Sequence, residues 1–168
     1  ISVINELPAG RKPISTYAVT GKMRERAFGF VKKQLEMGRQ GYVVCPMIDE
    51  SESDLNDVTS YSQKLAQGAF ADYKVGLLHG RMSAAEKEEV MSGFKRGEID
   101  LLVATTVVEV GVDVPNAAVM VIENADRFGL SQLHQLRGRV GRGEWESFCI
   151  LITDNTSPEC VQRMKIIS

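Results

Sequence analysis

Short apolar runs alternate with segments of helical periodicity along almost the whole chain. Six such runs, rich in Val, Ile and Leu, predict strands at residues 15–19, 41–46, 75–79, 100–104, 117–122 and 148–152. Strands that alternate with helices in this way usually build a parallel sheet with both faces covered. The sequence therefore predicts an α/β fold, with a parallel β-sheet and helices on both faces.

The helical segments carry start and stop signals of their own. Apolar residues at helical spacing run from Met23 to Leu35 and stop at Gly38, a residue type typical of the position after a helix. Ser83 followed by Glu86 has the spacing of a capping box and predicts a new helix there. Further helices are expected after the acidic stretch 49–57 and over 130–140, where leucines recur at helical spacing.

Length and composition limit the class of protein. A chain of 168 residues is long enough for one domain with a substantial core. With 43% apolar and 25% charged residues it is neither a disordered tail nor a collagen-like repeat nor a coiled coil. The net charge of -2 means that a nucleic-acid partner would have to be held by a local patch.

The remaining compositional features are mostly negative. Cys45, Cys149 and Cys160 show no paired spacing, which indicates a reducing compartment and predicts a cytoplasmic protein. His79 and His134 stand far apart, so no metal site is predicted. Because the first residue is isoleucine, we expect residues 1–168 to be a single domain cut from a longer chain.

No complete catalytic motif is present in the sequence. Gly21 and Lys22 are followed by Met23, so a phosphate-binding P-loop is excluded there. Gly138, Gly141 and Gly143 have the reverse order of a dinucleotide-binding fingerprint, and no strand is predicted before them. The chain is therefore not expected to carry a complete nucleotide site.

The stretch from Gln135 to Gly143 is the most informative candidate site. It contains three arginines and three glycines directly after an apolar helix. Arg139 and Arg142 are three residues apart and would share one side if the helix continued that far. Two guanidinium groups facing one way suit the oxygens of a phosphate chain. The alternative is an ordinary basic helix end exposed to solvent.

A second candidate site follows the strand predicted at 100–104. Thr105 and Thr106 present two hydroxyl groups at the end of the strand, and such groups can hold a phosphate without reading a base. Gly111 and Asp113 follow in a turn, where Asp113 could accept a hydrogen bond from a ribose hydroxyl, and Glu109 is grouped with them as a candidate nucleotide-binding residue. The alternative is a simple exit from a strand, with threonine present for its strand propensity.

The third candidate site is His79, Gly80 and Arg81, again at the end of a predicted strand. These residues precede a capped helix and could contact a nucleic-acid backbone. A single histidine is more often structural, and this motif alone is weak.

Taken in order, the three sites resemble the second motor lobe of superfamily 2 helicases. The arginine stretch is similar to motif VI of that superfamily, the stretch 105–113 to motif V, and 41–46 to motif IV. The longer run 125–143 is similar to the RecG family of branch-migration helicases and to its relative, the transcription-repair coupling factor. The runs 7–13, 46–52 and 102–115 favour the RecG family.

The resemblance implies a RecA-like lobe of an ATP-dependent DNA helicase that regresses stalled forks and migrates branched DNA junctions in repair and recombination. ATP and Mg²⁺ would be bound mainly by a first motor lobe, which is absent here, and the other partner would be branched or double-stranded DNA. The implied catalytic residues are Gln135, Arg139 and Arg142. Gly111 and Asp113 would face the nucleotide, and Thr105 would contact the DNA backbone, near Thr106, His79, Gly80 and Arg81.

Two alternatives stay open on the sequence. One is the equivalent lobe of the transcription-repair coupling factor, which is the same enzyme class with a different partner. The other is a regulatory module that keeps the lobe fold and does not hydrolyse ATP, although the set Gln135, Arg139 and Arg142 argues against it. In either case the isolated chain is expected to be inactive.

Overall fold

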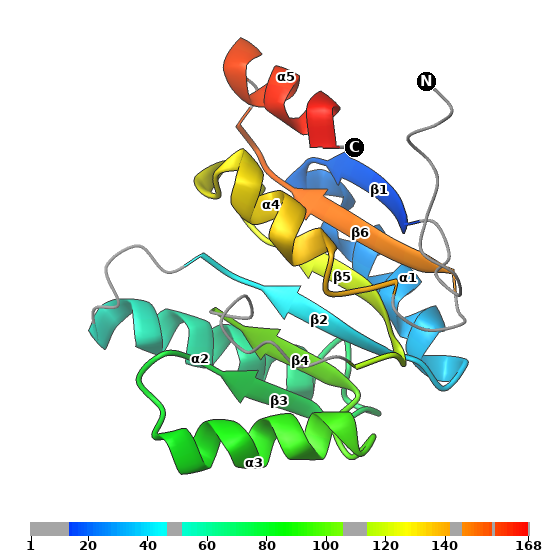
Figure 1. Ribbon diagram of the computed structural model, residues 1–168, viewed down its shortest axis with the longest axis vertical. Coiled ribbons are helices and arrows are strands. Elements are labelled where there is room, and N and C mark those ends of the chain that lie inside the picture. Colours follow the sequence, from blue (N-terminus) through cyan, green and yellow to red (C-terminus); the bar gives the residue numbers. More distant parts are fainter. Residues whose placement is uncertain (1–13, 47–51, 106–113, 142–145, 156, 168) are drawn as a thin grey trace.

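The computed structural model describes residues 14–46, 52–105, 114–141, 146–155 and 157–167. Their strands form one six-stranded sheet in the order β1-β6-β5-β2-β4-β3, and every neighbouring pair in it is parallel (Figure 1). The strand bounds are β1 Ile14–Val19, β2 Gln40–Val44, β3 Val75–Leu78, β4 Leu101–Ala104, β5 Ala117–Ile122 and β6 Ser147–Ile152.

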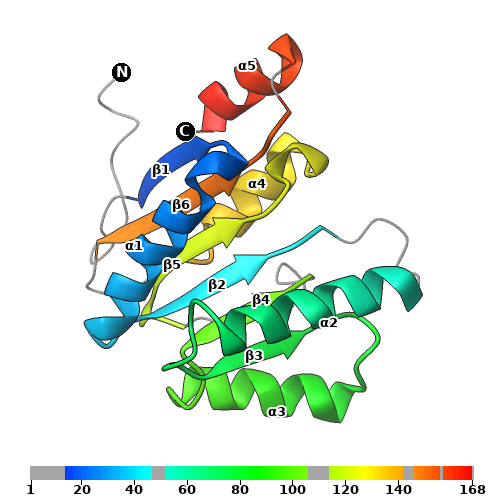
Figure 2. The same ribbon diagram turned by 180° about the vertical axis from the view of Figure 1, so that it is seen from behind.

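Helices cover both faces of the sheet. One face carries α3 (Ala84–Lys95), α4 (Leu130–Arg137) and α5 (Pro158–Ile167), in front of the sheet in Figure 1. The other carries α1 (Arg24–Glu36) and α2 (Glu52–Gln67), which stand in front in Figure 2. Two short 3-10 turns, η2 (Gly21–Met23) and η4 (Ala125–Arg127), precede α1 and α4. The α/β class and the two helical layers are thus confirmed.

Each helical layer closes a core of its own against the sheet. On the first face Phe94, Leu133 and Met164 pack against the inner strands, and on the second face Phe28 and Leu65 do the same. Because β4 and β5 are buried on both sides, their sequences are continuous apolar runs rather than alternating ones, and the second half of the buried strand β2 is apolar in the same way. This explains why those strands were readable from the sequence.

The local signals for helix ends are confirmed at two positions. The Ser83 side chain accepts from the backbone N–H of Glu86, and the Glu86 carboxylate accepts from the N–H of Ser83, so the capping box is complete. Gly38, after α1, has φ +87°, a conformation that favours glycine.

One expectation about the carboxyl-terminal half is wrong, and one helix there was not predicted. The helix predicted over 130–140 ends at Arg137, so Arg139 lies beyond it. Helix α5 was not expected; Cys160, Met164 and Ile167 form its buried side.

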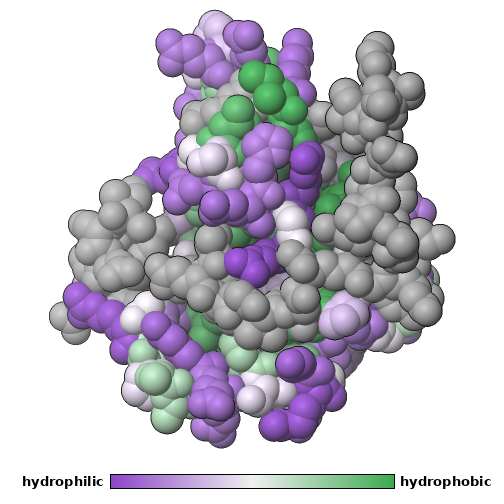
Figure 3. All heavy atoms as spheres, in the orientation of Figure 1, coloured by the Kyte–Doolittle hydropathy of each residue, from purple (hydrophilic) through white to green (hydrophobic). Residues whose placement is uncertain are grey.

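The described part of the first face carries both polar and apolar side chains. Among the coloured residues, Figure 3 shows many hydrophilic side chains and an apolar cluster near the top of the view, and Val161 and Ile166 of α5 are exposed. Within the described residues, no helix is both long and apolar enough to cross a membrane.

Candidate nucleic-acid and nucleotide interface

The carboxyl ends of four strands are joined by single backbone hydrogen bonds. The N–H of Glu123 after β5 donates to Val44 O of β2 at 2.8 Å. One strand further, the N–H of Cys45 donates to Ala104 O at 2.9 Å, and the N–H of Thr105 donates to Leu78 O at 3.1 Å. We call this row of bonds, from Glu123 to Leu78, the edge ladder. It holds the first residue after β5, β2 and β4 in a fixed place along one edge of the sheet.

Thr105 is the described residue on this edge with an unused polar group. Its side chain is buried, and its hydroxyl has no hydrogen-bond partner among the residues that the structure describes. A buried hydroxyl without a partner costs free energy, so native proteins usually satisfy it with protein, water or a ligand. The position and the unmet hydrogen bond both suit a residue that contacts a phosphodiester backbone.

His79, Gly80 and Arg81 lie at the next strand end, after β3. The ring Nδ1 of His79 accepts from the N–H of Arg81 at 3.2 Å, and its backbone N–H lies 3.3 Å from Met82 Sδ. These bonds close the turn into α3, so His79 has a structural role whether or not it meets a ligand. Arg81 is exposed and is therefore accessible on the same edge as Thr105.

The arginine stretch lies at the other end of α4. Gln135 is exposed on the helix, and Arg139 is half-buried two residues after its end. The N–H of Arg139 donates to Leu136 O at 2.9 Å, and Val140 is fully buried in the core. The guanidinium of Arg137 donates to Ile167 O at 2.7 Å and so ties α4 to the last turn of α5.

The topology separates the two groups of candidate residues. Because β5 and β6 are parallel, α4 between them must run back toward the amino ends of the strands (Figure 1). Arg139 therefore lies toward those ends, whereas Thr105 and His79 lie at the carboxyl ends. The described candidate residues therefore fall into two groups, one on the edge ladder and one on and after α4.

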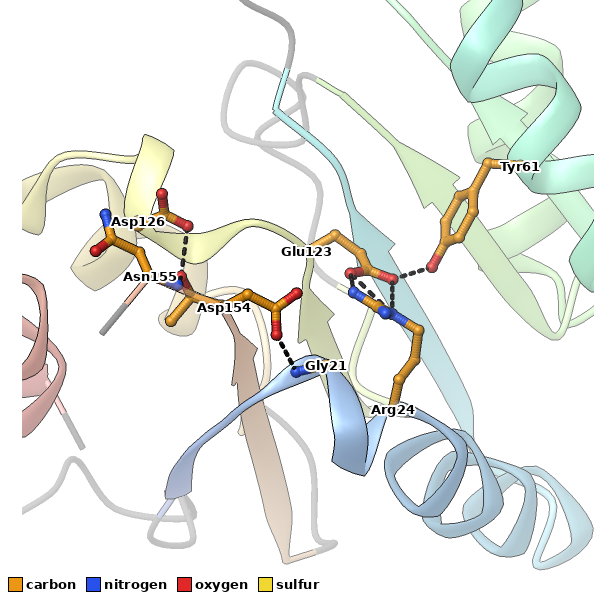
Figure 4. Close-up of polar contacts among 8 residues, drawn as sticks. Gly21, Arg24, Tyr61, Glu123, Asp126, Asp154 and Asn155 are labelled. Atoms are coloured by element: carbon orange, nitrogen blue, oxygen red, sulfur yellow. Dashed lines mark hydrogen bonds and ion pairs between the residues drawn. The ribbon is translucent and has the colours of Figure 1, made fainter. Parts of the chain in front are cut away.

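The structure adds a polar cluster that the sequence did not reveal. Glu123, buried at the end of β5, accepts from Arg24 Nη2 at 2.8 Å and from Arg24 Nε at 3.0 Å, and it also accepts a short hydrogen bond from the Tyr61 hydroxyl (Figure 4). Burial and the neighbouring Glu123 charge raise the pKa of Tyr61, so the phenol stays protonated. The hydrogen bonds that Arg24 donates to Glu123 raise the pKa of Arg24. The sequence contains one signal for this cluster, because Glu123 is the first polar residue after a fully apolar run.

A neighbouring set of contacts secures the ends of β1 and β6. The Gly21 N–H donates to Asp154 Oδ1 at 2.8 Å, and the Thr153 hydroxyl donates to Asp126 Oδ1 at 2.5 Å (Figure 4). These bonds fix η2 and η4 at the same edge of the sheet as the Glu123 cluster.

The other candidate residues lie outside the described residues: Thr106, Glu109, Gly111, Asp113 and Arg142. Their assignments stay predictions.

Comparisons with known proteins identify the family of the chain. The model of the helicase conserved C-terminal domain matches residues 25–144, a segment that includes the edge ladder and the arginine stretch. The chain therefore belongs to the helicase conserved C-terminal domain family. Within that family it is similar over its whole length to the corresponding lobe of the ATP-dependent DNA helicase RecG. It is 52% identical to RecG of Bacillus subtilis and 48% identical to RecG of Synechocystis.

The chain accounts for only part of these relatives. It covers 25% of the length of the Bacillus subtilis protein and 20% of that of the Synechocystis protein. Among solved structures, RecG bound to a three-way DNA junction matches 96% of the chain with a TM-score of 0.82 and 42% identity, and the match covers 21% of that structure's chain. The C-terminal domain of the Saccharomyces cerevisiae protein Dbp5 matches with a TM-score of 0.61 at 16% identity, which shows a shared fold.

Proposed function

We propose that this chain is the second motor lobe of an ATP-dependent double-stranded DNA translocase that regresses stalled forks and migrates branched junctions. The observation that carries the proposal is the similarity of the whole of this chain to part of RecG, which includes the structure of RecG bound to a three-way DNA junction. Residues 1–168 would form one lobe of a longer cytoplasmic polypeptide.

The chemistry would be divided between two lobes. In phosphoryl transfer, catalysis is mostly positioning and charge stabilisation, and an arginine that reaches the phosphates can supply much of the latter. A first motor lobe would bind ATP, while Arg139 and Arg142 of this lobe would reach the phosphates when the cleft closes. Gln135 would act beside these arginines. Glu109, Gly111 and Asp113 would line the nucleotide side of the lobe.

Magnesium would belong to the first lobe. Among the described residues no group of three or more His, Cys, Asp and Glu side chains comes together in a way that could hold a metal ion. When bound, the ion would neutralise phosphate charge. The residues of this chain fit the complementary role of supplying positive side chains and backbone contacts.

DNA would lie along the edge ladder. Thr105, with its unused buried hydroxyl, would donate a hydrogen bond to a phosphate oxygen, and Arg81 would add positive charge one strand away. Thr106, His79 and Gly80 would complete this contact region. Such contacts carry no base information, so binding should be independent of sequence. Closure of the cleft around ATP and its reopening after hydrolysis would move this edge along the duplex.

The test compares the 168-residue chain with the longest natural polypeptide that contains it. The isolated chain should show no ATPase above background, and its weak DNA binding should fall steeply with salt. The longer polypeptide should hydrolyse ATP and be stimulated by branched DNA. A DNA-stimulated ATPase in the 168-residue chain would contradict the division of the site between two lobes. A longer protein that binds DNA without hydrolysis would instead favour the regulatory module.

A further inference from the structure

Two side chains from distant parts of the chain meet at one buried carboxylate, that of Glu123. Arg24 is the first residue of α1, Tyr61 lies in α2, and Glu123 directly follows β5. The Glu123 side chain is only 7% exposed, whereas that of Arg24 is 36% exposed. Both carboxylate oxygens accept from Arg24, and Oε2 also accepts from the Tyr61 hydroxyl. The single carboxylate thus ties both helices of one face to a strand end; we call this set the carboxylate clamp.

The clamp lies where connections leave the sheet in opposite directions. After β5 the chain passes to the face of α4, while after β2 it passes to the face of α2 (Figures 1 and 2). Such switch points leave a crevice at the carboxyl ends of parallel strands, and ligands of α/β proteins bind there. A hollow of about 320 Å³ is found at this place, lined by Arg24, Cys45, Tyr61, Glu123 and Asn124.

Stability alone does not account for a charged clamp. A buried ion pair gains little over well-packed apolar side chains, although removing one partner from it is costly. What a carboxylate with three donors supplies is geometry, because each donor fixes its direction. Figure 4 shows the guanidinium and the phenol approaching Glu123 from different elements.

The edge ladder connects the clamp to Thr105. The N–H of Glu123 bonds to β2, the N–H of Cys45 bonds to β4, and β4 ends at Thr105. Parallel strands in a closely packed sheet do not slide independently, because each step would break a backbone hydrogen bond. A shift of the strand end at Glu123 would therefore be passed to the buried hydroxyl of Thr105.

We propose that Glu123 is a positioning residue for nucleic-acid binding: its carboxylate holds Arg24 and Tyr61 and thereby fixes the strand ends that place Thr105 against the DNA backbone. This inference rests on the proposed function. Glu123 touches neither DNA nor ATP in this role. The clamp acts only through the edge ladder.

The experiment uses Glu123→Gln in the longest natural polypeptide that carries this chain. Gln keeps the size of the side chain and removes the charge that orients Arg24. The concentration of branched DNA that gives half-maximal ATPase should rise about tenfold, and turnover at saturating DNA should stay within about twofold. The matched control is Glu98→Gln, which removes a carboxylate from the exposed Arg96–Glu98 pair and should change neither quantity.

A double variant separates positioning from stability. Glu123→Gln alone leaves the half-buried Arg24 charge without its partner and should lower the melting temperature. Arg24→Gln combined with Glu123→Gln leaves no unpaired charge in the clamp, so most of that loss should be recovered. The concentration of branched DNA that gives half-maximal ATPase should stay raised in the double variant, because the oriented clamp is still missing. The inference would be overturned if this concentration returned to its normal value together with the melting temperature. It would also be overturned if the concentration did not change in Glu123→Gln.

A direct binding measurement separates this inference from the proposed function. The dissociation constant for fluorescent branched DNA should rise by the same factor in Glu123→Gln. If the unmodified protein binds DNA without ATPase activity, the proposed motor function fails. The clamp is then still tested by the ratio of the dissociation constants of Glu123→Gln and of the unmodified protein. If the ratio is one, or no DNA binds, the clamp inference fails.

Discussion

Asp154 caps a helix to which it does not belong. Thr20 precedes η2 and α1, but its side chain makes no capping hydrogen bond. The N–H of Gly21 donates instead to Oδ1 of Asp154, which follows β6. Gly21 makes this approach possible, because a Cβ there would lie 2.9 Å from both Asp154 carboxylate oxygens. The start of α1, and with it Arg24, is thereby fixed to the sheet.

Replacing Asp154 by Ala should lower the free energy of unfolding by about 1 kcal/mol, the usual cost of losing a helix cap. Gly21→Ala should also destabilise the protein, because the carboxylate would have to move away from the N–H. Urea denaturation measures both effects. Asp72→Ala, at an exposed site after α2, is the control and should have little effect. Equal stability of Asp154→Ala and the unmodified protein would show that water replaces the cap at no cost.

Two of the cysteines should be chemically inert in the folded protein. Burial raises the pKa of Cys149 to about 12, and burial together with the Glu123 charge raises that of Cys45 to about 12, from an ordinary value of 9.0. A rise of that size lowers the thiolate fraction at pH 8 by about 10³, and the thiolate is the reactive form. Maleimide labelling followed by mass spectrometry should show both thiols protected in the native state and labelled in urea. Equal rates in the two conditions would contradict this environment.

At the scale of the element, α3 is the helix whose start depends most clearly on a local pair. The Ser83 backbone and side-chain bonds lower the pKa of Glu86 from its ordinary value of 4.5. A carboxylate with a lowered pKa stabilises the fold above its unfolded pKa, and this contribution is lost as the pH falls through the folded value. The capping box should therefore weaken in acid.

Glu86→Gln tests this pH dependence. The variant should be less stable than the unmodified protein at pH 7, and the difference should shrink toward zero as the pH falls below 4.5. Melting temperatures across this range give the measurement. Glu89→Gln, an exposed change on the same helix, serves as the control for general charge effects. A difference that does not depend on pH would mean that the Glu86 charge has no part in the cap.

The elements also show how far the sequence could be interpreted. Strands β4 and β5 were predicted because burial on both faces leaves continuous apolar runs. The apolar second half of β2 had the same effect, and α3 was predicted because its capping box is local. The end of α4 was not predicted correctly, since the residues up to Arg139 are as compatible with a continuing helix as with its end. Glu123 was missed for a different reason: its partners Arg24 and Tyr61 are 99 and 62 residues away, and only the folded sheet brings them together.

At the scale of the whole molecule, the lobe presents its two candidate sites at different ends of the sheet. Thr105 and the edge ladder lie at the carboxyl ends of the strands, whereas α4 carries Arg139 back toward the amino ends. In the proposed motor, one rigid body could then hold DNA and reach the nucleotide at the same time. Movement of the lobe as a unit would couple the two.

Arg142→Ala in the longest natural polypeptide tests this account most directly, by steady-state ATPase with branched DNA. Turnover should fall on the order of 10³-fold, as expected for the loss of an arginine that stabilises the transferring phosphoryl group. ATP affinity should change far less, because a first lobe would hold most of the nucleotide. Arg96→Ala, at an exposed surface pair, should keep full activity. Near-normal turnover in a folded Arg142→Ala protein would contradict the assignment of this lobe as half of an ATP site.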